Sequence, residues 1–425
     1  MRKEIESFKE YKIVFYDLFK WTTISIIKGI VVGFAVSIFL IILEILVNQT
    51  KNETFFGIPY FFFLPIAMGL SAWMVYKTLP EAEGDGTEDI VRDSVESNKR
   101  LNFFSFSVKQ FATLITIISG GSAGKEAPSA QIGSYISLVF SRILKFSHAD
   151  RILTVITGVS AGFAVVFGAP IAGALFALEA LFSGRILYRV CVPAFISAFI
   201  AFWAMKVMNV SYIYKPIKVE FVPNFWELAN FITVVIAGVF FGLISYLVII
   251  GIENATKFAK IVIIHPFFKG LVGGSIIVVL TLIFGTKYLG LGLETISLSL
   301  TESYQATILE PLLKILFTSI TLGFGGSGGF VTPIFFIGST AGNFFGHLVE
   351  GNVPLFAALG FVAVLSGSTN SPIASTILAA ELFGSEIIHF AAVASIISYI
   401  VSSKKSVFSS EIIEIIDKRF RTHYK

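Results

Sequence analysis

The sequence predicts an all-α polytopic membrane protein built as an inverted repeat, with many tilted and broken helices. Three observations lead to this fold class: an apolar composition, a motif that occurs twice, and glycine-proline breaks between apolar segments. Of the 425 residues, 55% are hydrophobic and only 14% are charged, and the mean hydropathy is +0.82. No water-soluble domain of this length requires so much apolar surface. We therefore expect the chain to lie in a bilayer.

Several apolar segments are long enough, or nearly so, to cross a bilayer as helices. They are Ile24–Val47, Phe61–Val75, Val190–Met205, Phe231–Ile252 and Leu271–Phe284. The lone cysteine, Cys191, excludes an intramolecular disulfide and is predicted to be a small core residue.

Both ends of the chain carry basic residues, and neither reads as a cleaved signal peptide. Basic flanks favour the cytoplasmic side, so residues 1–20 and 418–425 are predicted to be cytoplasmic segments joined by an even number of crossings. The net charge of +4 is small and scattered, which does not indicate a nucleic-acid partner. We expect a multi-pass protein of the cell (inner) membrane.

A glycine-rich motif occurs twice, at an offset of 205 residues (from 120 to 325), and a second pair of motifs follows in the same order. The first pair is Gly120-Gly121-Ser122-x-Gly124-x-x-x-Pro128-x-x-x-Ile132-Gly133 and Gly325-Gly326-Ser327-x-Gly329-x-x-x-Pro333-x-x-x-Ile337-Gly338. The second pair is Pro170-Ile171-Ala172 with Glu179, and Pro372-Ile373-Ala374 with Glu381. Matched motifs in matched order predict two transmembrane repeats, residues 21–223 and 224–417.

Repeated halves of membrane proteins commonly face opposite ways, and broken helices from both then converge near the midplane. Pro128 suits the first turn of a helix, where its missing N–H costs nothing. The helix that starts there directs unpaired N–H groups and a positive dipole at whatever precedes it, which suits an anion. Glu126 lies at the same helix start and would compete with a soluble anion for those donors, so it is predicted to act as a gate.

Three motifs, in order, resemble those of the CLC family of chloride channels and proton/chloride antiporters. They are Gly84-Asp85-Gly86-Thr87-Glu88, similar to Gly-Ser-Gly-Ile-Pro-Glu, then Gly124-Lys125-Glu126-Ala127-Pro128, similar to Gly-Arg-Glu-Gly-Pro, and Gly329-Phe330-Val331-Thr332-Pro333, similar to Gly-x-Phe-x-Pro. The resemblance extends over nearly the whole chain. It implies a CLC-type fold, transport of chloride or a related small anion, and a homodimer with one pathway per subunit.

The resemblance also assigns roles to single residues. Glu126 matches the family's external gating glutamate, and Phe330 and Val331 match residues whose backbone N–H groups face the central ion. The predicted anion-binding residues are Asp85, Gly86, Gly124, Lys125, Ala127, Phe330, Val331 and Phe408.

Three positions depart from the family pattern. Asp85 stands where many members have a serine ligand; a carboxylate there repels an anion unless it is protonated or turned away, so a solvated loop acid or a helix cap is the alternative. Phe408 replaces the central tyrosine and either lines the pathway or simply packs. Ala180 replaces the internal glutamate of proton-coupled members, which leaves both a channel and an atypically coupled exchanger open.

Further alternatives remain for the function. Gly329-x-Val331-Thr332-Pro333 is similar to the fluoride/proton antiporter branch, whereas Pro128 departs from the threonine usual there. A structural or sensing membrane protein of the same fold, without conduction, is another alternative. For Glu126 itself, the alternative to gating is a carboxylate at a helix dipole that pairs with Lys125 or Arg142.

The remaining polar residues suggest no chemistry. Glu179 and Glu381 occupy equivalent positions in the two repeats, and this symmetry favours a structural role such as capping or pairing. His148 and His389 are isolated and lack metal-ligand spacing, so we predict neither a metal nor a cofactor. Catalytic motifs are missing, and an enzyme is not expected. The expected partners are chloride or another small anion, protons in an exchanger, the lipid bilayer and a second copy of the chain.

Overall fold

The computed structural model describes residues 2–51, 54–55, 57–78, 103–180, 188–210, 219, 222–262, 265–402 and 406–408. The described part is almost entirely helical, and its one sheet is a pair of two-residue antiparallel strands. The predicted all-α fold class is thus confirmed. The predicted tail, 418–425, lies outside the described residues.

The elements follow one another in two sets. The first set is α1 (Arg2–Lys51), β1 (Thr54–Phe55), β2 (Ile58–Pro59), η1 (Tyr60–Phe63), α2 (Leu64–Thr78), α4 (Phe103–Ile118), α5 (Glu126–Ile143), α6 (His148–Phe167), α7 (Pro170–Ala180) and α8 (Tyr188–Val207). The second set is α9 (Leu228–Val262), α10 (Pro266–Phe284), η2 (Thr286–Tyr288), α11 (Leu293–Ser299), α12 (Leu309–Gly323), α13 (Val331–Leu348), α14 (Val353–Thr369), α15 (Pro372–Phe383), η3 (Ser385–Ile387) and α16 (Ile388–Val401).

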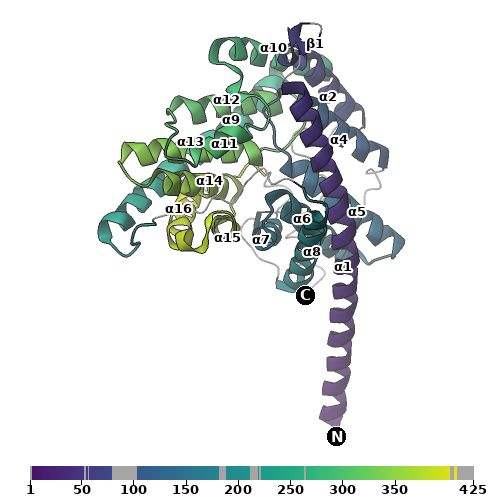
Figure 1. The fold of residues 1–425 in the computed structure, drawn as a ribbon. Helices are drawn as coiled ribbons and strands as arrows, with labels where there is room; N and C mark the ends of the chain where they lie inside the picture. Colours follow the sequence, from purple (N-terminus) through teal and green to yellow (C-terminus); the bar gives the residue numbers. More distant parts are fainter. Residues whose placement is uncertain are drawn as a thin grey trace.

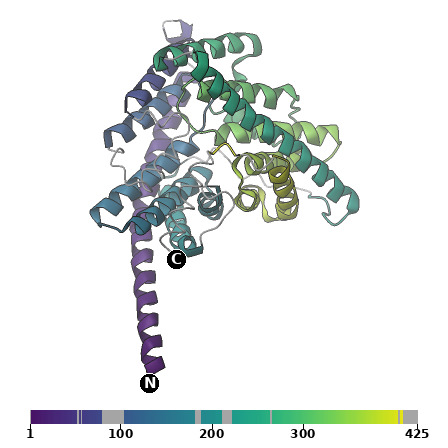
Figure 2. The same cartoon turned by 180° about the vertical axis from the view of Figure 1, so that it is seen from behind.

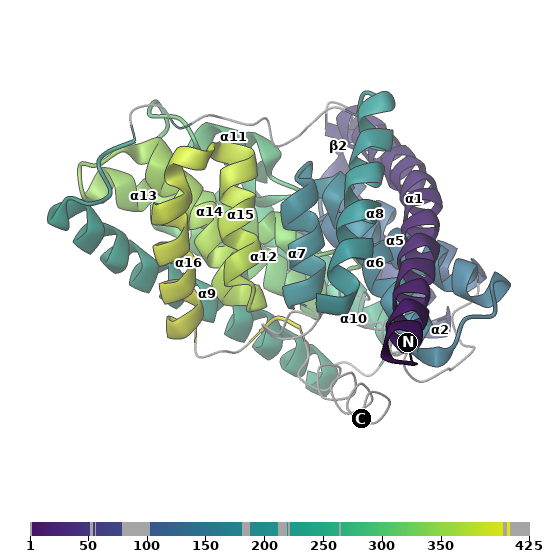
Figure 3. The same ribbon diagram turned by 90° about the horizontal axis from the view of Figure 1, so that it is seen from below.

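The order of helices in the second set follows that of the first. Helices α5 and α13 each have 18 residues, and the short helices α7 and α15 have 11 and 12. Figure 3 shows the two sets beside each other, with α7 and α15 adjacent at their junction. The limits of the repeats, 21–223 and 224–417, and their inverted orientation stay predictions.

Helices long and apolar enough to cross a membrane are found at six places in the described part of the chain. Five contain the five apolar segments predicted above. The sixth, Asp150–Phe167 in α6, is not among those predictions; it lies mostly inside the protein, so it does not need a continuous apolar surface. Figure 1 shows α6 enclosed between α1, α5, α7 and α8.

The outer helices expose large apolar side chains. On α1 these include Ile38 and Ile45, about half exposed, and on α9 they include Ile236 and Leu243. Figure 2 shows α1 and α9 at opposite sides of the molecule. Such surfaces are unfavourable in water and suit lipid tails, which supports a multi-pass membrane protein.

Matching turns connect the helix pairs that follow the two glycine motifs. Gly168 (φ 68°) ends α6 in the left-handed conformation, and Asn370 (φ 56°) ends α14 in the same way. Each is followed two residues later by a proline that starts the next short helix, Pro170 or Pro372. A left-handed residue and a following proline are a common way to end one helix and begin another.

Close glycine contacts hold the helices behind each motif. A Cβ added to Gly133 on α5 would lie 2.1 Å from the carbonyl oxygen of Gly158 on α6, and one on Gly338 of α13 would lie 2.3 Å from that of Gly360 on α14. The backbones touch only because these side chains are missing. Small residues at helix contacts are the usual device for tight packing in a membrane.

Glu179 and Glu381 form a reciprocal clamp between α7 and α15. The Glu179 carboxylate accepts hydrogen bonds from the N–H groups of Ile373 (3.1 Å) and Ala374 (2.7 Å). The Glu381 carboxylate accepts from Ile171 (3.1 Å) and Ala172 (2.7 Å). Each acid thus caps the N-terminus of the other short helix. This geometry agrees with the structural role predicted for the two acids.

We expect Glu179→Ala and Glu381→Ala to lower the thermal midpoint of the detergent-solubilised protein by similar amounts. Each substitution removes two charge-assisted hydrogen bonds and leaves two N–H groups unsatisfied, a loss of about 3 kcal/mol. The control is Glu253→Ala, which removes an exposed contact to Lys257 and should change little. Midpoints unchanged in both clamp variants would contradict the capping role.

Candidate functional site

The two glycine motifs meet at a reciprocal backbone bridge. The N–H of Gly124 donates to the carbonyl of Gly329 at 2.6 Å, and the N–H of Gly329 donates to the carbonyl of Gly124 at 2.9 Å. Helix α5 begins two residues after Gly124, and α13 begins two residues after Gly329. The starts of the two helices are therefore held next to each other inside the protein, as the repeat predicts.

Glu126 is fully buried at the first residue of α5 and reaches across to α13. Its carboxylate accepts a hydrogen bond from the Thr332 hydroxyl, at 2.7 Å and 2.6 Å to its two oxygens, and Oε2 also accepts from the Thr332 backbone N–H at 3.0 Å. Thr332 is the second residue of α13. The carboxylate thus occupies a donor in the first turn of the facing helix, where an anion is favoured.

The predicted alternative pairing of Glu126 with Arg142 is wrong. Arg142 lies in the last turn of the same helix, about 24 Å along its axis from Glu126 at 1.5 Å per residue.

Other donors at the two helix starts remain unpaired. Within the described residues, no hydrogen bond uses the backbone N–H of Ala127 on α5, or that of Phe330 and Val331 at the start of α13. All three residues are buried. Buried N–H groups without partners are unfavourable unless a ligand or water satisfies them. They are therefore positioned to bind an anion.

Gly124 and Lys125 have roles that differ from simple ligands. The N–H of Gly124 is used by the bridge, and a Cβ added there would lie 2.6 Å from Glu126 Oε2 and 2.9 Å from the Thr332 nitrogen. Gly124 therefore leaves room for the Glu126 carboxylate and the Thr332 backbone to approach each other. Lys125 is buried, and its backbone N–H faces the Thr332 hydroxyl at 3.4 Å.

Phe408 packs beside the start of α13. Its ring lies edge-to-face on that of Phe330, with the centroids 5.1 Å apart, and both side chains are buried. The preceding residue is held by a bond from the Val407 N–H to the Ser368 carbonyl, 2.9 Å. The Phe408 ring, which has no hydroxyl, thus covers one side of the Phe330 side chain.

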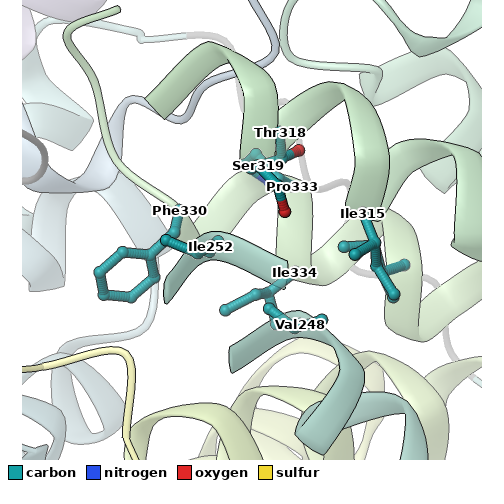
Figure 4. A pocket seen from close by; sticks show the side chains of 9 residues that line it. Val248, Ile252, Ile315, Thr318, Ser319, Phe330, Pro333 and Ile334 are labelled. Carbon is teal, nitrogen blue, oxygen red and sulfur yellow. The ribbon is translucent and has the colours of Figure 1, made fainter. Parts of the chain in front are cut away.

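The other side of Phe330 faces a small apolar pocket, which is too narrow for a water-sized sphere. Figure 4 shows the side chains that line this pocket, among them Phe330, Ile252, Ile315 and Ser319. The Ser319 hydroxyl is buried and has no hydrogen-bond partner among the described residues. Phe330 is therefore enclosed by side chains on both sides, and only its backbone is available to a ligand.

A buried lysine supports the turn that precedes α5. The ammonium of Lys314, on α12, donates to the carbonyls of Tyr288 (3.0 Å) and Gly290 (2.8 Å), and the side chain is completely buried. The Gly290 N–H in turn donates to the carbonyl of Gly120 at 3.0 Å. Lys314 thus fixes the loop on which the first glycine of the motif rests.

Sequence reasoning predicts several residues at the two helix starts but misses two residues that hold these starts in place. Thr332 stands out in the sequence only for its similarity to the fluoride branch. Its neighbour Val331 is the repeat counterpart of Glu126, and this position could have indicated that Thr332 lies close to Glu126. Lys314 is the repeat counterpart of Lys109 at the same offset of 205 residues, and this match could have drawn attention to it. Asp85 and Gly86, predicted as anion ligands, lie outside the described residues.

Histidines and acids are scattered in the described part of the chain, where no group of three or more His, Cys, Asp or Glu side chains is close enough to hold a metal ion. His389 lies against the rings of Phe225 and Trp226, so its surroundings are those of a packing residue.

We expect Gly124→Ala to reduce anion flux about tenfold or more. The added Cβ would meet both the Glu126 carboxylate and the Thr332 backbone, and forcing an extra methyl into such a site costs about 1 to 3 kcal/mol. Gly329→Ala is the comparison, because its Cβ would lie 3.0 Å from both the Cβ and the backbone nitrogen of Ala127, a looser fit than at Gly124, and its effect should be smaller. Equal flux in both variants and wild type, measured in proteoliposomes, would contradict the close fit at Gly124.

Comparisons with known proteins agree with this geometry. Residues 67–403 match the family model described as "Voltage gated chloride channel". A relative from Pseudomonas syringae pv. tomato, named "Chloride/fluoride channel protein", is 30% identical over 401 residues, which cover 92% of this chain and 86% of the relative.

Solved structures share the fold. A CLC-type fluoride/proton antiporter superimposes with a TM-score of 0.85 at 25% identity, covering 92% of this chain and 97% of that one. A slow cyanobacterial Cl⁻/H⁺ antiporter, at 20% identity, gives 0.74 over 94% of this chain and 99% of that one. The resemblance drawn from the motifs is confirmed: this chain belongs to the voltage gated chloride channel (CLC) family.

Proposed function

We propose that the protein moves chloride, or a related small anion, between the starts of α5 and α13, and that Glu126 gates this pathway. The observation that carries the proposal is the position of the Glu126 carboxylate. It accepts from the N–H and hydroxyl of Thr332, next to the unpaired N–H groups of Phe330 and Val331. A soluble anion would compete for the same donors.

The proposed mechanism follows from this competition. While Glu126 is ionised and bound to Thr332, its negative charge repels an anion and its oxygens occupy a donor. When the side chain turns away or takes up a proton, the Thr332 donors join those of Phe330 and Val331. An anion then exchanges part of its hydration for several N–H and O–H groups, each weak enough to let it leave again.

Proton coupling stays open in this proposal. Ala180 is buried and lacks an acidic group, while Glu179 beside it is engaged in capping α15. Glu126 is therefore the acid best placed to carry a proton, from the outer side. A channel and an atypically coupled exchanger both fit.

Fluoride is the second candidate ion. The observation in its favour is Thr332, whose hydroxyl adds a compact donor beside the backbone N–H groups. The name of the Pseudomonas relative mentions fluoride, and the structure at 25% identity is a fluoride/proton antiporter. A strong hydrogen-bond acceptor such as fluoride gains most from an O–H donor.

The other predicted features complete the proposal. We infer a homodimer of the cell (inner) membrane, a transporter and not an enzyme, with inverted repeats at 21–223 and 224–417. Asp85, Gly86, Lys125, Ala127 and Phe408 stay proposed parts of the anion pathway, as ligands or lining, together with Phe330 and Val331.

The first test is anion efflux from proteoliposomes with simultaneous recording of external pH, for wild type and Glu126→Ala. Chloride and fluoride are tested separately. In an exchanger, wild type should take up protons in fixed ratio to the anion, and Glu126→Ala should lose proton movement while the anion still flows. In a channel, wild type should move the anion alone, and Glu126→Ala should abolish the dependence of flux on external pH.

Glu179→Gln is the control, because the buried Glu179 carboxylate binds the start of α15 and not the starts of α5 and α13. The flux of this variant should depend on external pH as in wild type. Absence of both chloride and fluoride flux in the folded wild-type protein would overturn the transport proposal and favour a non-conducting protein.

Thr332→Val should separate the role of the hydroxyl from that of the backbone. The substitution keeps shape and the N–H but removes the O–H donor, so Glu126 should be held less firmly and flux should depend less on external pH. Fluoride flux should fall more than chloride flux, by about tenfold relative to it, since a hydrogen bond to a charged partner contributes about 1.5 kcal/mol. Thr332→Ser keeps the hydroxyl and should behave as wild type; equal behaviour of Val and Ser variants would refute this role.

A further inference from the structure

Two hydroxyl pairs connect the glycine motifs to the helices of the opposite set. The Ser122 hydroxyl lies 2.9 Å from that of Thr318 on α12. The Ser327 hydroxyl lies 3.0 Å from that of Thr113 on α4. Ser122 and Ser327 are counterparts at the repeat offset of 205 residues, and so are Thr113 and Thr318. The two contacts are therefore one contact made twice.

The backbone of each serine is held by the opposite set as well. The Ser122 N–H donates to the Thr321 hydroxyl at 3.0 Å, and the Ser327 N–H donates to the Thr116 hydroxyl at 3.2 Å. These threonines are also repeat counterparts. The serines and threonines of this arrangement are at most 2% exposed, so water does not replace the lost bond when one is broken. We call these contacts, made by Thr113, Thr116, Ser122, Thr318, Thr321 and Ser327, the cross-brace.

The cross-brace lies directly before the two helix starts. Ser122 is four residues before Glu126, and Ser327 is three residues before Phe330. The bridge between Gly124 and Gly329 stands between the cross-brace and the helices. Movement of either serine would therefore move a helix start and its N–H groups. Thr318 and Phe330 also line the same pocket (Figure 4).

The two-fold pattern of contacts ends at the gate. The repeat counterpart of Glu126 is Val331, and that of Thr332 is Ala127. Thr332 therefore binds the Glu126 carboxylate, while Val331 and Ala127 have no side-chain group to form the matching contact. The structure thus combines a symmetric frame with one acid that the repeat does not duplicate.

We propose that Thr113, Thr318, Ser122 and Ser327 are positioning residues that fix the spacing of the two helix starts, and thereby the selectivity among anions. This inference rests on the proposed transport function. Selection by N–H groups depends on where those groups stand, and a shift of a fraction of an ångström changes the fit of a small ion more than that of a larger one. The side chains act through the backbone and do not touch the anion.

The test compares Thr113→Val and Thr318→Val with Thr113→Ser and Thr318→Ser. Valine keeps the shape and removes the hydroxyl, whereas serine keeps the hydroxyl. The measured quantity is the ratio of fluoride to chloride flux in proteoliposomes, together with the ratio of the two binding constants from calorimetry. Each valine variant should change both ratios about three- to tenfold, the loss expected for one buried hydrogen bond. Both serine variants should keep the wild-type ratios.

Thr281→Val is the matched control. Thr281 is a buried threonine on α10 whose hydroxyl donates to the Ile277 carbonyl of its own helix. It should leave the ratios unchanged. Because the two contacts are repeat counterparts, Thr113→Val and Thr318→Val should change the fluoride-to-chloride ratios by similar factors.

The outcomes separate this inference from the transport proposal. If the wild type transports and Glu126→Ala behaves as expected, but the valine variants keep wild-type ratios, only the positioning role is overturned. If the wild type neither binds nor transports either anion, both proposals fall. If a valine variant does not fold, Ser122→Ala and Ser327→Ala break the same hydroxyl contacts by removing the serine partner, while the serine N–H groups keep their hydrogen bonds. The flux and binding ratios of these two variants then test the positioning role.

Discussion

A helix that starts inside a membrane leaves N–H groups without partners, and the structure around α5 and α13 is arranged to answer this constraint. In a low-dielectric interior such groups must find a partner within the protein or in a ligand. Gly124 and Gly329 satisfy each other, Thr332 donates to Glu126, and the threonines of the cross-brace accept from the serines. Among the described residues, the N–H groups of Ala127, Phe330 and Val331 have no partner in the protein, and in the proposed mechanism an anion satisfies them.

The same constraint applies at both helix starts, but only one of them carries an acid. Duplication supplies two helix starts, two serines and two capping acids, each held by the opposite set of helices. The proposed function needs an asymmetric element, because a carboxylate at both starts would place like charges together and oppose anion binding. Glu126 on one side and Val331 on the other meet this need with a single acid, and Thr332 provides the donor that holds it.

The sequence was sufficient for the fold class and for the position of Glu126 at the start of a helix, because glycines, a proline and an acid rarely occur together within apolar segments except where a helix is broken. It was also sufficient for the structural role of Glu179 and Glu381, since equivalence in two repeats points to a shared task. It could not give Thr332 as the partner of Glu126, because 206 residues separate them and only the folded chain shows which first-turn donor the carboxylate reaches. Helix α6 was not among the predicted apolar segments, and most of it is surrounded by protein.

Lys314 illustrates how far the support of the site extends from the anion. A buried ammonium is unfavourable unless carbonyl oxygens or a carboxylate compensate it, and here two carbonyls of the loop before α11 do so. That loop touches Gly120, six residues before Glu126. The Lys314 side chain therefore stabilises this turn through its two hydrogen bonds. A side chain on α12 thus supports the segment before α5 through one loop and one backbone hydrogen bond.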